Sequence, residues 1–384
     1  MSIPLVRSTI NETDIDELVE WLRKYPRLTK GSLTPKFEEE WATFIGTQYS
    51  VFVNSGSSAN LLMLYCLIET KKLKRGDTVV VPAVSWATDL APVVQLGLNP
   101  VLCDCNLQDL SIDLGHFETI CKEQKPSALI LVSVLGLVPE MDKIVEICKK
   151  YNVLLLEDAC ESFGSRYKGK NLGSFGLMGT FSTYFGHHIS TIEGGVINTN
   201  DRHIYNVLKS LRSHGWARDM DQDYQDKLKS RHNVEDFENL YKFYHFGFNL
   251  RSTDLSAFIG LGQLRKAAAI CAKRKENFDL YNSQVKNNFW EPGKQPNRYV
   301  SNFAYPLITK NRDAIVAELH ANEVECRPLV CGNLGRQPVW YENYDAAHLP
   351  NADIVDEYGM YLPNSHDLTA EEVVLIASII NPLL

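Results

Sequence analysis

The side chains with the greatest chemical potential lie in one segment, residues 181–195, which reads F-S-T-Y-F-G-H-H-I-S-T-I-E-G-G. Its two adjacent imidazoles, His187 and His188, can take up and release protons, because an imidazole titrates near neutral pH. Two neighbouring side chains on a loop do not easily face one site, so we expect only one of the two to be a base. The alternative for each is a structural histidine whose ring nitrogens are satisfied inside the fold.

A second segment has the composition of an anion-binding turn. Residues 54–60 read N-S-G-S-S-A-N and separate a short apolar strand pattern from a helical pattern. Gly56 and Ser57 would let the backbone approach an anion, and the first N–H groups of the following helix would point at it. Ser182, in the histidine segment, could donate its hydroxyl to the same group, which suits a phosphate. Many strand-to-helix turns are rich in Gly and Ser, so a purely structural turn is an equal alternative.

Two further residues could hold a flat heteroaromatic ring. Trp86 follows a predicted strand and could stack on the ring, although core packing is the simpler interpretation of a lone Trp. Asp158 ends the apolar run L-L-L-E-D, and open α/β sheets bind ligands at the carboxyl ends of their strands. A carboxylate there could pair with a protonated pyridine nitrogen and make the ring an electron sink. The alternatives for Asp158 are a helix cap or an ion pair.

A third polar segment lies later in the chain, at residues 247–255, which read G-F-N-L-R-S-T-D-L. Asn249 and Arg251 stand there among apolar residues. The amide of Asn249 could bind a phosphate, and it could do so from a neighbouring subunit. A turn that only precedes a helix explains the segment equally well.

These segments need a scaffold in which strands and helices alternate. The runs 128–132 and 153–156 are apolar throughout, as in strands covered on both faces of a mostly parallel sheet, and helical patterns such as 143–151 lie between them. The sequence therefore predicts an α/β fold with a large three-layer domain. Strand and helix patterns after residue 303 predict a smaller β-α-β-like domain.

We place the boundary between the two predicted domains near residue 255. Residues 1–255 would form an N-terminal arm and the large domain, and residues 256–384 a linking helix and the small C-terminal domain. Thr13 is predicted to cap the first helix. The polar stretch 219–245 interrupts the alternation of strand and helix patterns and is predicted to be a surface excursion.

The composition limits the classes of function. The chain has 384 residues, enough for two domains or for one large domain with an appendage. Of these residues 45% are hydrophobic and 22% charged, as in an ordinary globular enzyme. A net charge of −8 argues against surfaces for nucleic acid or anionic membranes. The nine cysteines are odd in number and include no C-x-x-C, so we expect neither a disulfide framework nor a metal site. No secretory signal or long apolar span is found, and a cytoplasmic location is expected.

Together, these motifs resemble the DegT/DnrJ/EryC1/StrS family of nucleotide-sugar aminotransferases and dehydratases. The resemblance extends from Gly31 to the C-terminus and rests on S-G-S-S-A-N, V-P-A-V-S-W, E-D-A-C-E-S, F-S…E-G-G and G-F-N-L-R-S-T-D-L in this order. Each motif alone is unspecific, but their joint order is highly specific. The resemblance implies the aspartate-aminotransferase (type I) fold and the cofactor pyridoxal 5′-phosphate (PLP).

One position departs from the usual pattern of that family. Aminotransferases of the family read F-S-x₄-K and hold PLP covalently through the lysine, whereas this chain has His187 in that place. Imidazole moves protons but forms no stable covalent bond with the cofactor aldehyde. The resemblance therefore implies that PLP, or its amino form pyridoxamine 5′-phosphate (PMP), binds noncovalently and that His187 is the catalytic base.

The resemblance also implies how the cofactor phosphate is held. Gly56, Ser57 and Ser182 would bind it from one subunit. Asn249 would reach over from the second subunit of a homodimer with shared active sites.

The remaining implied contacts concern the cofactor ring and the substrate. Trp86 would stack on the pyridine ring, and Asp158 would pair with its nitrogen. Glu161 would lie near the ring's phenolic oxygen or the substrate. The residues expected to contact the substrate are His188, His214, Arg218 and Arg327.

Within the family, the H-H-x₄-E-G-G variant resembles lyases that dehydrate GDP-linked 4-keto-6-deoxy sugars at C3. The resemblance implies that glutamate supplies the amino group that converts PLP to PMP. The C3 hydroxyl would then be expelled, with release of ammonia and a 4-keto-3-deoxy sugar. Whether the sugar is a hexose or a heptose, and which nucleotide it carries, is left open.

Two other functions compete with a dehydratase. A nucleotide-sugar 4-aminotransferase would need another lysine, and Lys168 and Lys170 are out of register. A non-catalytic regulator with the PLP fold is the alternative of another class, but no basic arm or DNA-binding motif is present. A related group of dehydratases carries an iron–sulfur cluster on cysteines; here Cys271 stands alone, so we expect no cluster and no reductase partner.

Overall fold

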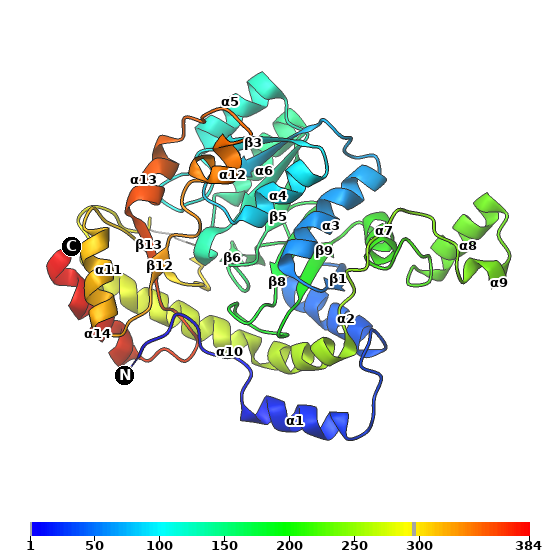
Figure 1. Ribbon diagram of the computed structural model, residues 1–384, viewed down its shortest axis with the longest axis horizontal. Helices are drawn as coiled ribbons and strands as arrows, with labels where there is room; N and C mark the ends of the chain where they lie inside the picture. Colours follow the sequence, from blue (N-terminus) through cyan, green and yellow to red (C-terminus); the bar gives the residue numbers. More distant parts are fainter. Residues whose placement is uncertain (1, 294–296) are drawn as a thin grey trace.

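A seven-stranded sheet forms the centre of the molecule (Figure 1). The computed structural model describes residues 2–293 and 297–384. The strand order is β1-β9-β8-β5-β4-β2-β3. These strands are β1 (Tyr49–Val53), β2 (Thr78–Pro82), β3 (Asn99–Cys103), β4 (Ala128–Val132), β5 (Leu154–Asp158), β8 (Met178–Ser182) and β9 (Gly195–Thr199).

The sheet is parallel except at one strand. β8, β5, β4, β2 and β3 pair parallel in turn, whereas β9 pairs antiparallel with both β1 and β8. All five residues of β4 are buried, as expected for a strand covered on both faces. The predicted α/β fold with a mostly parallel sheet is confirmed. The histidine segment runs from the end of β8 to the start of β9, two strands to which the sequence pattern assigned no element.

Helices lie on both sides of this sheet (Figure 1). α3 packs against β8, β9, α4 and α7, while α2 packs against β1 and the long α10. The bounds of these helices, and of α5 and α6, are α2 (Leu33–Ile45), α3 (Gly56–Glu69), α4 (Ala87–Gln95), α5 (Leu114–Gln124), α6 (Met141–Tyr151), α7 (Arg202–Arg212) and α10 (Asp254–Gln284). Even the 31-residue α10 is too polar for a bilayer, and no helix within the described ranges has the length and apolar character to cross a membrane.

The C-terminal part carries a small sheet of its own. Its order is β11-β13-β12, and both pairings are antiparallel, so β11 and β12 run parallel to each other. Because α11 connects these two strands, they form the predicted β-α-β-like arrangement, split by the unpredicted strand β13. The elements are β11 (Tyr305–Ile308), α11 (Arg312–Ala321), β12 (Arg327–Pro328), α12 (Pro338–Tyr341), α13 (Pro350–Tyr358), β13 (Gly359–Leu362) and α14 (Ala370–Ile380). The domain boundary near residue 255 stays a prediction.

A third sheet and the N-terminal helix complete the body. The sheet consists of the two-residue strands β6 (Arg166–Tyr167), β7 (Lys170–Asn171) and β10 (Arg298–Tyr299). α1 (Glu12–Leu22) begins at Asn11 rather than at the predicted cap, Thr13. Asn11 accepts a hydrogen bond from the Asp14 amide at 3.1 Å, and the Asp14 carboxylate accepts one from the Asn11 amide at 2.8 Å. This reciprocal capping box satisfies two amides, which a cap at Thr13 would leave unpaired.

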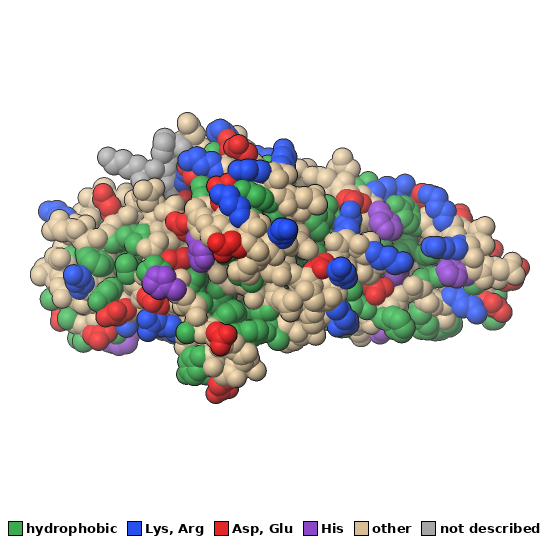
Figure 2. Space-filling model, turned by 90° about the horizontal axis from the view of Figure 1, so that it is seen from above, with side chains coloured by type: hydrophobic (Ala, Val, Ile, Leu, Met, Phe, Trp, Pro, Cys, Tyr) green, Lys and Arg blue, Asp and Glu red, His purple; other side chains and the backbone are tan. Residues whose placement is uncertain are grey.

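Residues 219–246 form an arm that projects from the body (Figure 1). The arm contains α8 (Gln222–His232) and α9 (Asp236–Asn239), and α8 has no buried residue. Its visible face carries basic, acidic and hydrophobic side chains side by side (Figure 2). The predicted surface excursion is therefore partly helical.

A buried ion pair fixes the edge of the central sheet. Arg212 of α7 is fully buried and bonds both the Glu38 carboxylate and the Phe52 carbonyl, while the Phe52 amide donates to Glu38 at 2.8 Å. Removing Glu38 leaves the buried Arg212 with the more distant Asp219, 3.8 Å away, as its remaining ion-pair partner. Breaking a buried pair in this way typically costs about 3–5 kcal/mol. We expect Glu38→Ala to lower the free energy of unfolding, measured with chemical denaturant, by about this amount. Glu40→Ala, on the same helix but in an exposed pair with Lys36, should change it little; equal effects would contradict the assignment.

Candidate active site

The glycine-rich turn and the histidine segment meet at the start of α3. Ser55 caps the helix, its hydroxyl accepting from the Ser58 amide at 3.0 Å. A Cβ on Gly56 would lie 2.7 Å from the Cβ of Ser182, and a Cβ on Gly195 would lie 2.2 Å from the Ser55 carbonyl oxygen. Only glycine fits such close approaches. The turn therefore presents small groups and free helical N–H groups, the arrangement that suits an anion.

Asp158 lies at the carboxyl end of β5 and its carboxylate is oriented from two sides. The Cys160 amide donates to Oδ1 at 2.8 Å, and Asn60 Nδ2 of α3 donates to Oδ2 at 2.6 Å. Thr180 of β8 fixes Asn60 in turn, with its hydroxyl donating to Oδ1 at 2.6 Å. Asn60 was missed by sequence reasoning, although an Asn among the apolar residues near the start of a predicted helix is a usable signal, because a buried amide needs partners.

The adjacent acid, Glu157, belongs to a different part of the fold. Successive side chains of a strand point to opposite faces, and Glu157 points away from Asp158 into the turn before β8. Its carboxylate accepts from the amides of Gly173, Phe175 and Gly176 at 2.7, 2.6 and 2.7 Å. Only one member of the carboxylate pair is therefore available at the site.

His187 lies on the Asp158 side of the histidine segment. Its pKa is lowered to about 4, chiefly by burial, and the polar backbone of Cys160 and the charge of Asp158 offset only part of that effect. Its ring is 5.3 Å from that of Phe303, and among the described residues its Nδ1 has no hydrogen-bond partner. Burial keeps this imidazole neutral, which is the form that a base requires, although Nδ1 itself is buried.

His188 faces the interior instead. It is fully buried, its Nε2 lies 2.9 Å from the Ser301 carbonyl oxygen, and its ring is 6.1 Å from those of both Phe163 and Phe303. Because a carbonyl only accepts, Nε2 carries the hydrogen. The predicted contact of His188 with substrate is not supported by this geometry, since the ring has no accessible surface. Its Nε2 is bonded, whereas its Nδ1, like that of His187, has no hydrogen-bond partner among the described residues.

Trp86 and Glu161 border the same region. Trp86 precedes α4 and is 58% exposed, so it is not a core residue. Glu161 accepts from the Leu135 amide at 2.7 Å, and burial raises its pKa to about 7, with the Leu135 bond opposing the shift and the Asp158 charge adding to it.

Arg327 is brought to this region through the small sheet. It pairs with Tyr361 across β12 and β13. Burial, together with the charge of Glu161, raises the pKa of Tyr361 to about 12, and Arg327 acts in the opposite direction. Tyr361, which the sequence analysis did not single out, thus lies within electrostatic reach of both Glu161 and Arg327.

The remaining predicted residues lie along the base of the arm. Asn249 is exposed, and the carbonyl of the adjoining Leu250 accepts a hydrogen bond from the Asn54 amide at 3.1 Å. This bond places the Asn249 segment beside the glycine-rich turn. His214 lies 4.9 Å from the Trp216 ring, and the guanidinium of Arg218 is 5.0 Å from that ring. Their predicted roles toward substrate, and those of Ser57 and Asn249 toward phosphate, stay predictions.

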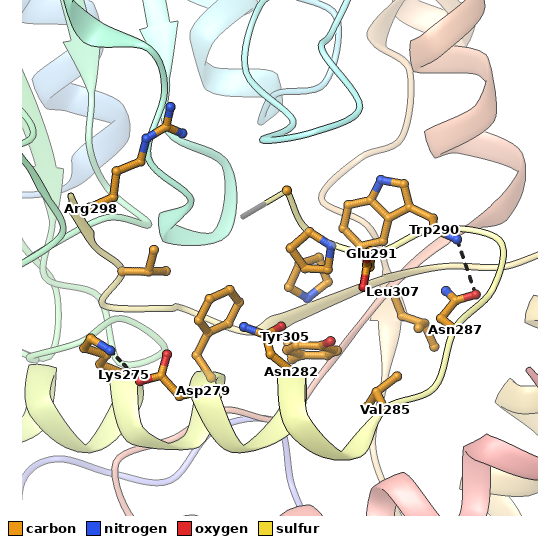
Figure 3. Close-up of a pocket in the computed structure, with 15 residues that line it drawn as sticks. Lys275, Asp279, Asn282, Val285, Asn287, Trp290, Glu291, Arg298, Tyr305 and Leu307 are labelled. Carbon is orange, nitrogen blue, oxygen red and sulfur yellow. Dashed lines mark hydrogen bonds and ion pairs between the residues drawn. The ribbon is translucent and has the colours of Figure 1, made fainter. Parts of the chain in front are cut away.

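A separate cavity of about 320 Å³ opens between α10 and the β11 region (Figure 3). Lys275, Asn282 and Trp290 line it, and none of the predicted site residues does. It lies outside the candidate site.

The described part of the chain offers no ready metal site. It contains no group of three or more His, Cys, Asp or Glu side chains placed to hold a metal ion. All nine cysteines are free thiols, and Cys271 is buried with its Sγ 3.7 Å from the Phe163 carbonyl.

Comparisons with known proteins agree with this arrangement. The DegT/DnrJ/EryC1/StrS aminotransferase family matches residues 9–381. GDP-4-keto-6-deoxy-D-mannose 3-dehydratase of Yersinia pseudotuberculosis is 34% identical over 384 residues, covering 97% of this chain and 96% of the relative. The enzyme of the same name from Escherichia coli O55:H7 is 33% identical over 374 residues, covering 95% of each chain.

A solved structure extends the likeness to three dimensions. The Escherichia coli GDP-4-keto-6-deoxy-D-mannose-3-dehydratase with bound hydrated PLP superposes with a TM-score of 0.89 at 32% identity, covering 99% of each chain. The chain therefore belongs to the DegT/DnrJ/EryC1/StrS aminotransferase family.

Proposed function

We propose that this chain is a lyase: a PLP/PMP- and glutamate-dependent 3-dehydratase of a GDP-linked 4-keto-6-deoxy sugar. It would release ammonia and a 4-keto-3-deoxy sugar. The observation that carries the proposal is His187, a neutral imidazole on the Asp158 side of the loop, at the position where aminotransferases of the family have lysine. Relatives of the same length and fold bear the name of this activity.

The residues present fit a PLP-type cofactor. The Gly56 turn offers a place for its phosphate, because no side chain of residue 56 fills the turn. A Cβ at this position would collide with Ser182. The oriented carboxylate of Asp158 would pair with the ring nitrogen, and the exposed indole of Trp86 would cover a ring face. When bound, such a cofactor supplies an electron sink that makes a neighbouring hydroxyl easier to expel. No lysine occupies position 187, so the cofactor would be held by these noncovalent contacts.

The chain's own contribution to the reaction is proton movement and orientation. His187 enters the cycle neutral, so a ring nitrogen can accept a proton. Once protonated, it can return a proton to the departing C3 hydroxyl, and such assistance is typically worth about 10²- to 10⁴-fold in rate. Glu161, whose pKa is raised to about 7, is available in both protonation states near the same site.

The substrate would lie toward Arg327 and Tyr361, which lie within electrostatic reach of Glu161. Arg327 supplies a positive charge suited to a diphosphate. His214 and Arg218 are proposed as further substrate contacts. A GDP-linked hexose follows the names of the relatives, and a heptose is the second candidate.

The proposal is tested by turnover of GDP-4-keto-6-deoxymannose. We expect purified protein with PLP and glutamate to release one ammonia per sugar consumed, in buffer without iron, sulfide or a reductase. Glutamate alone should shift the visible absorption of bound PLP, and denaturation should release unmodified PLP. A 4-amino sugar as product would indicate an aminotransferase, and bound PLP that glutamate does not alter would indicate a regulator. A heptose analogue, run in parallel, decides between the two sugar classes.

We also propose that the protein is a homodimer with shared active sites, in the cytoplasm. The arm supports the dimer, because its aromatic residues Phe237, Tyr241 and Phe246 are 86%, 71% and 86% exposed, and exposed aromatic clusters mark association surfaces. Asn249, at the base of the arm, would then reach the partner's phosphate site.

Sedimentation should give the mass of a dimer. Replacing Phe237 and Phe246 together with Ser should weaken the dimer about tenfold or more, because buried aromatic anchors carry much of an interface's energy. Tyr25→Ser, which removes a 95% exposed aromatic away from the arm, is the control. A monomeric wild type, or equal losses in both variants, would contradict the proposal.

A further inference from the structure

A second acid lies buried behind Asp158. Asp89, in the first turn of α4, is completely buried. Asn60 Nδ2 donates to its Oδ1 at 3.0 Å and, at the same time, to Asp158 Oδ2 at 2.6 Å. One amide nitrogen therefore bonds the carboxyl groups of two residues that are 69 positions apart in the sequence. Ser85 donates its hydroxyl to the other oxygen of Asp89.

Two carboxyl groups so placed do not both ionise readily. Burial disfavours the charged form, and a neighbouring like charge disfavours it further. The pKa of Asp89 is raised well above its ordinary value, first by burial and next by Asp158, with the Ser85 bond opposing. The other titratable groups that act on this pair of carboxyl groups include three acids, Glu161 and the thiols of Cys160 and Cys331, and one base, His187, which interacts with Asp158. Burial and the neighbouring charge of Asp158 therefore favour the protonated form of Asp89.

We propose that Asp89 is a positioning residue for Asp158, sharing one proton with it so that a single, oriented negative charge faces the ring nitrogen of the cofactor. The proposal rests on the proposed function, because it needs PLP or PMP at the site. The Cys160 amide and Asn60 set the carboxylate's direction, and Asp89 sets its charge. If both carboxyl groups were ionised, they would hold the proton of the ring nitrogen more tightly, and that proton would be lost only at a higher pH. The protonated partner avoids this while still contributing a hydrogen bond.

The test uses full-length protein loaded with PLP, as wild type, Asp89→Asn and Asp89→Leu. The visible absorption of the bound cofactor is titrated with pH, and PLP affinity is measured by fluorescence quenching. In the wild type, Asp89 should lose its proton at alkaline pH, and this loss should appear as a step in the visible absorption of the bound cofactor. Asp89→Asn retains a donor but cannot ionise, so it should lack that step and keep its PLP affinity within about threefold. Asp89→Leu has no donor and should bind PLP about tenfold more weakly.

A purely structural role for Asp89 would predict different results. If the spectral titration of Asp89→Asn equals that of the wild type, Asp89 does not share the proton and the proposal is wrong. If Asp89→Leu is folded by circular dichroism and binds PLP as the wild type does, Asp89 does not position Asp158. Should both variants fail to fold, carboxyl ¹³C NMR of the wild type decides: an Asp resonance in protonated form at neutral pH is expected, and its absence overturns the proposal. A wild type that binds no PLP would refute the proposed function instead.

Discussion

Replacing His187 with Asn is expected to lower the rate of ammonia release by about 10²- to 10⁴-fold while PLP remains bound. The reason is that the amide keeps much of the size and polarity of the imidazole but cannot carry a proton through the cycle. The phosphate turn and Asp158 are untouched, so the loss should fall on kcat rather than on cofactor affinity. Steady-state ammonia release and PLP titration measure the two quantities.

The pH dependence of the same reaction adds a second check on His187. Its lowered pKa of about 4 means that the imidazole stays neutral as pH falls through the range where an ordinary histidine, at 6.5, would protonate. The kcat/KM of the wild type, which reports ionisations of the free protein, should therefore not fall as the pH is lowered through 6.5.

His203→Asn, which makes the same change at an exposed histidine of α7, is the control for His187→Asn. Unchanged kcat in His187→Asn would remove this residue from the mechanism.

Removing the charge at Asp158 is the change with the next largest expected effect. In Asp158→Asn the backbone contact with Cys160 can survive, but no negative charge remains to hold a proton on the cofactor ring. Fixed charges aimed at a reacting group are typically worth about 10²- to 10³-fold in kcat, and we expect a loss of that size. PLP affinity should also fall, because the ring nitrogen loses its partner.

The control for Asp158→Asn must be another buried acid. Asp109 is 5% exposed and its pKa is raised to about 6 by burial, but it lies near Arg298, away from the site. Asp109→Asn should leave kcat unchanged even if the protein is less stable. Equal activity losses in the two variants would mean that Asp158 acts on folding and not on the reaction.

Much of the fold followed from local pattern. Uninterrupted apolar runs such as 128–132 predicted strands covered on both faces, and the structure has them in a mostly parallel sheet. Short strands with mixed composition escaped prediction: β13 was missed, and with it the antiparallel order of the small sheet. Four residues with one glycine carry too little periodicity to identify a strand, and only pairing with β11 and β12 makes them one.

The site divides in the same way. The sequence alone supplied the chemical types: a glycine-rich turn, an aspartate after a buried strand, and two adjacent histidines between β8 and β9. Only the tertiary structure decided which members of each pair face the site. His187 lies toward Asp158, whereas His188 is sealed against Ser301.

The same holds for the acids. Glu157 and Asp158 are adjacent and of like chemistry, yet Glu157 points to the opposite face of β5 and bonds backbone amides of the turn before β8. Asp89 of helix α4 instead shares the Asn60 amide with Asp158. Burial, shared hydrogen bonds and like-charge repulsion arise between residues far apart in the chain, so they alter a group's proton affinity without leaving a local signal. The sequence thus determined which reactive groups the protein owns, and the packing determined which of them are exposed, charged and aimed at one place.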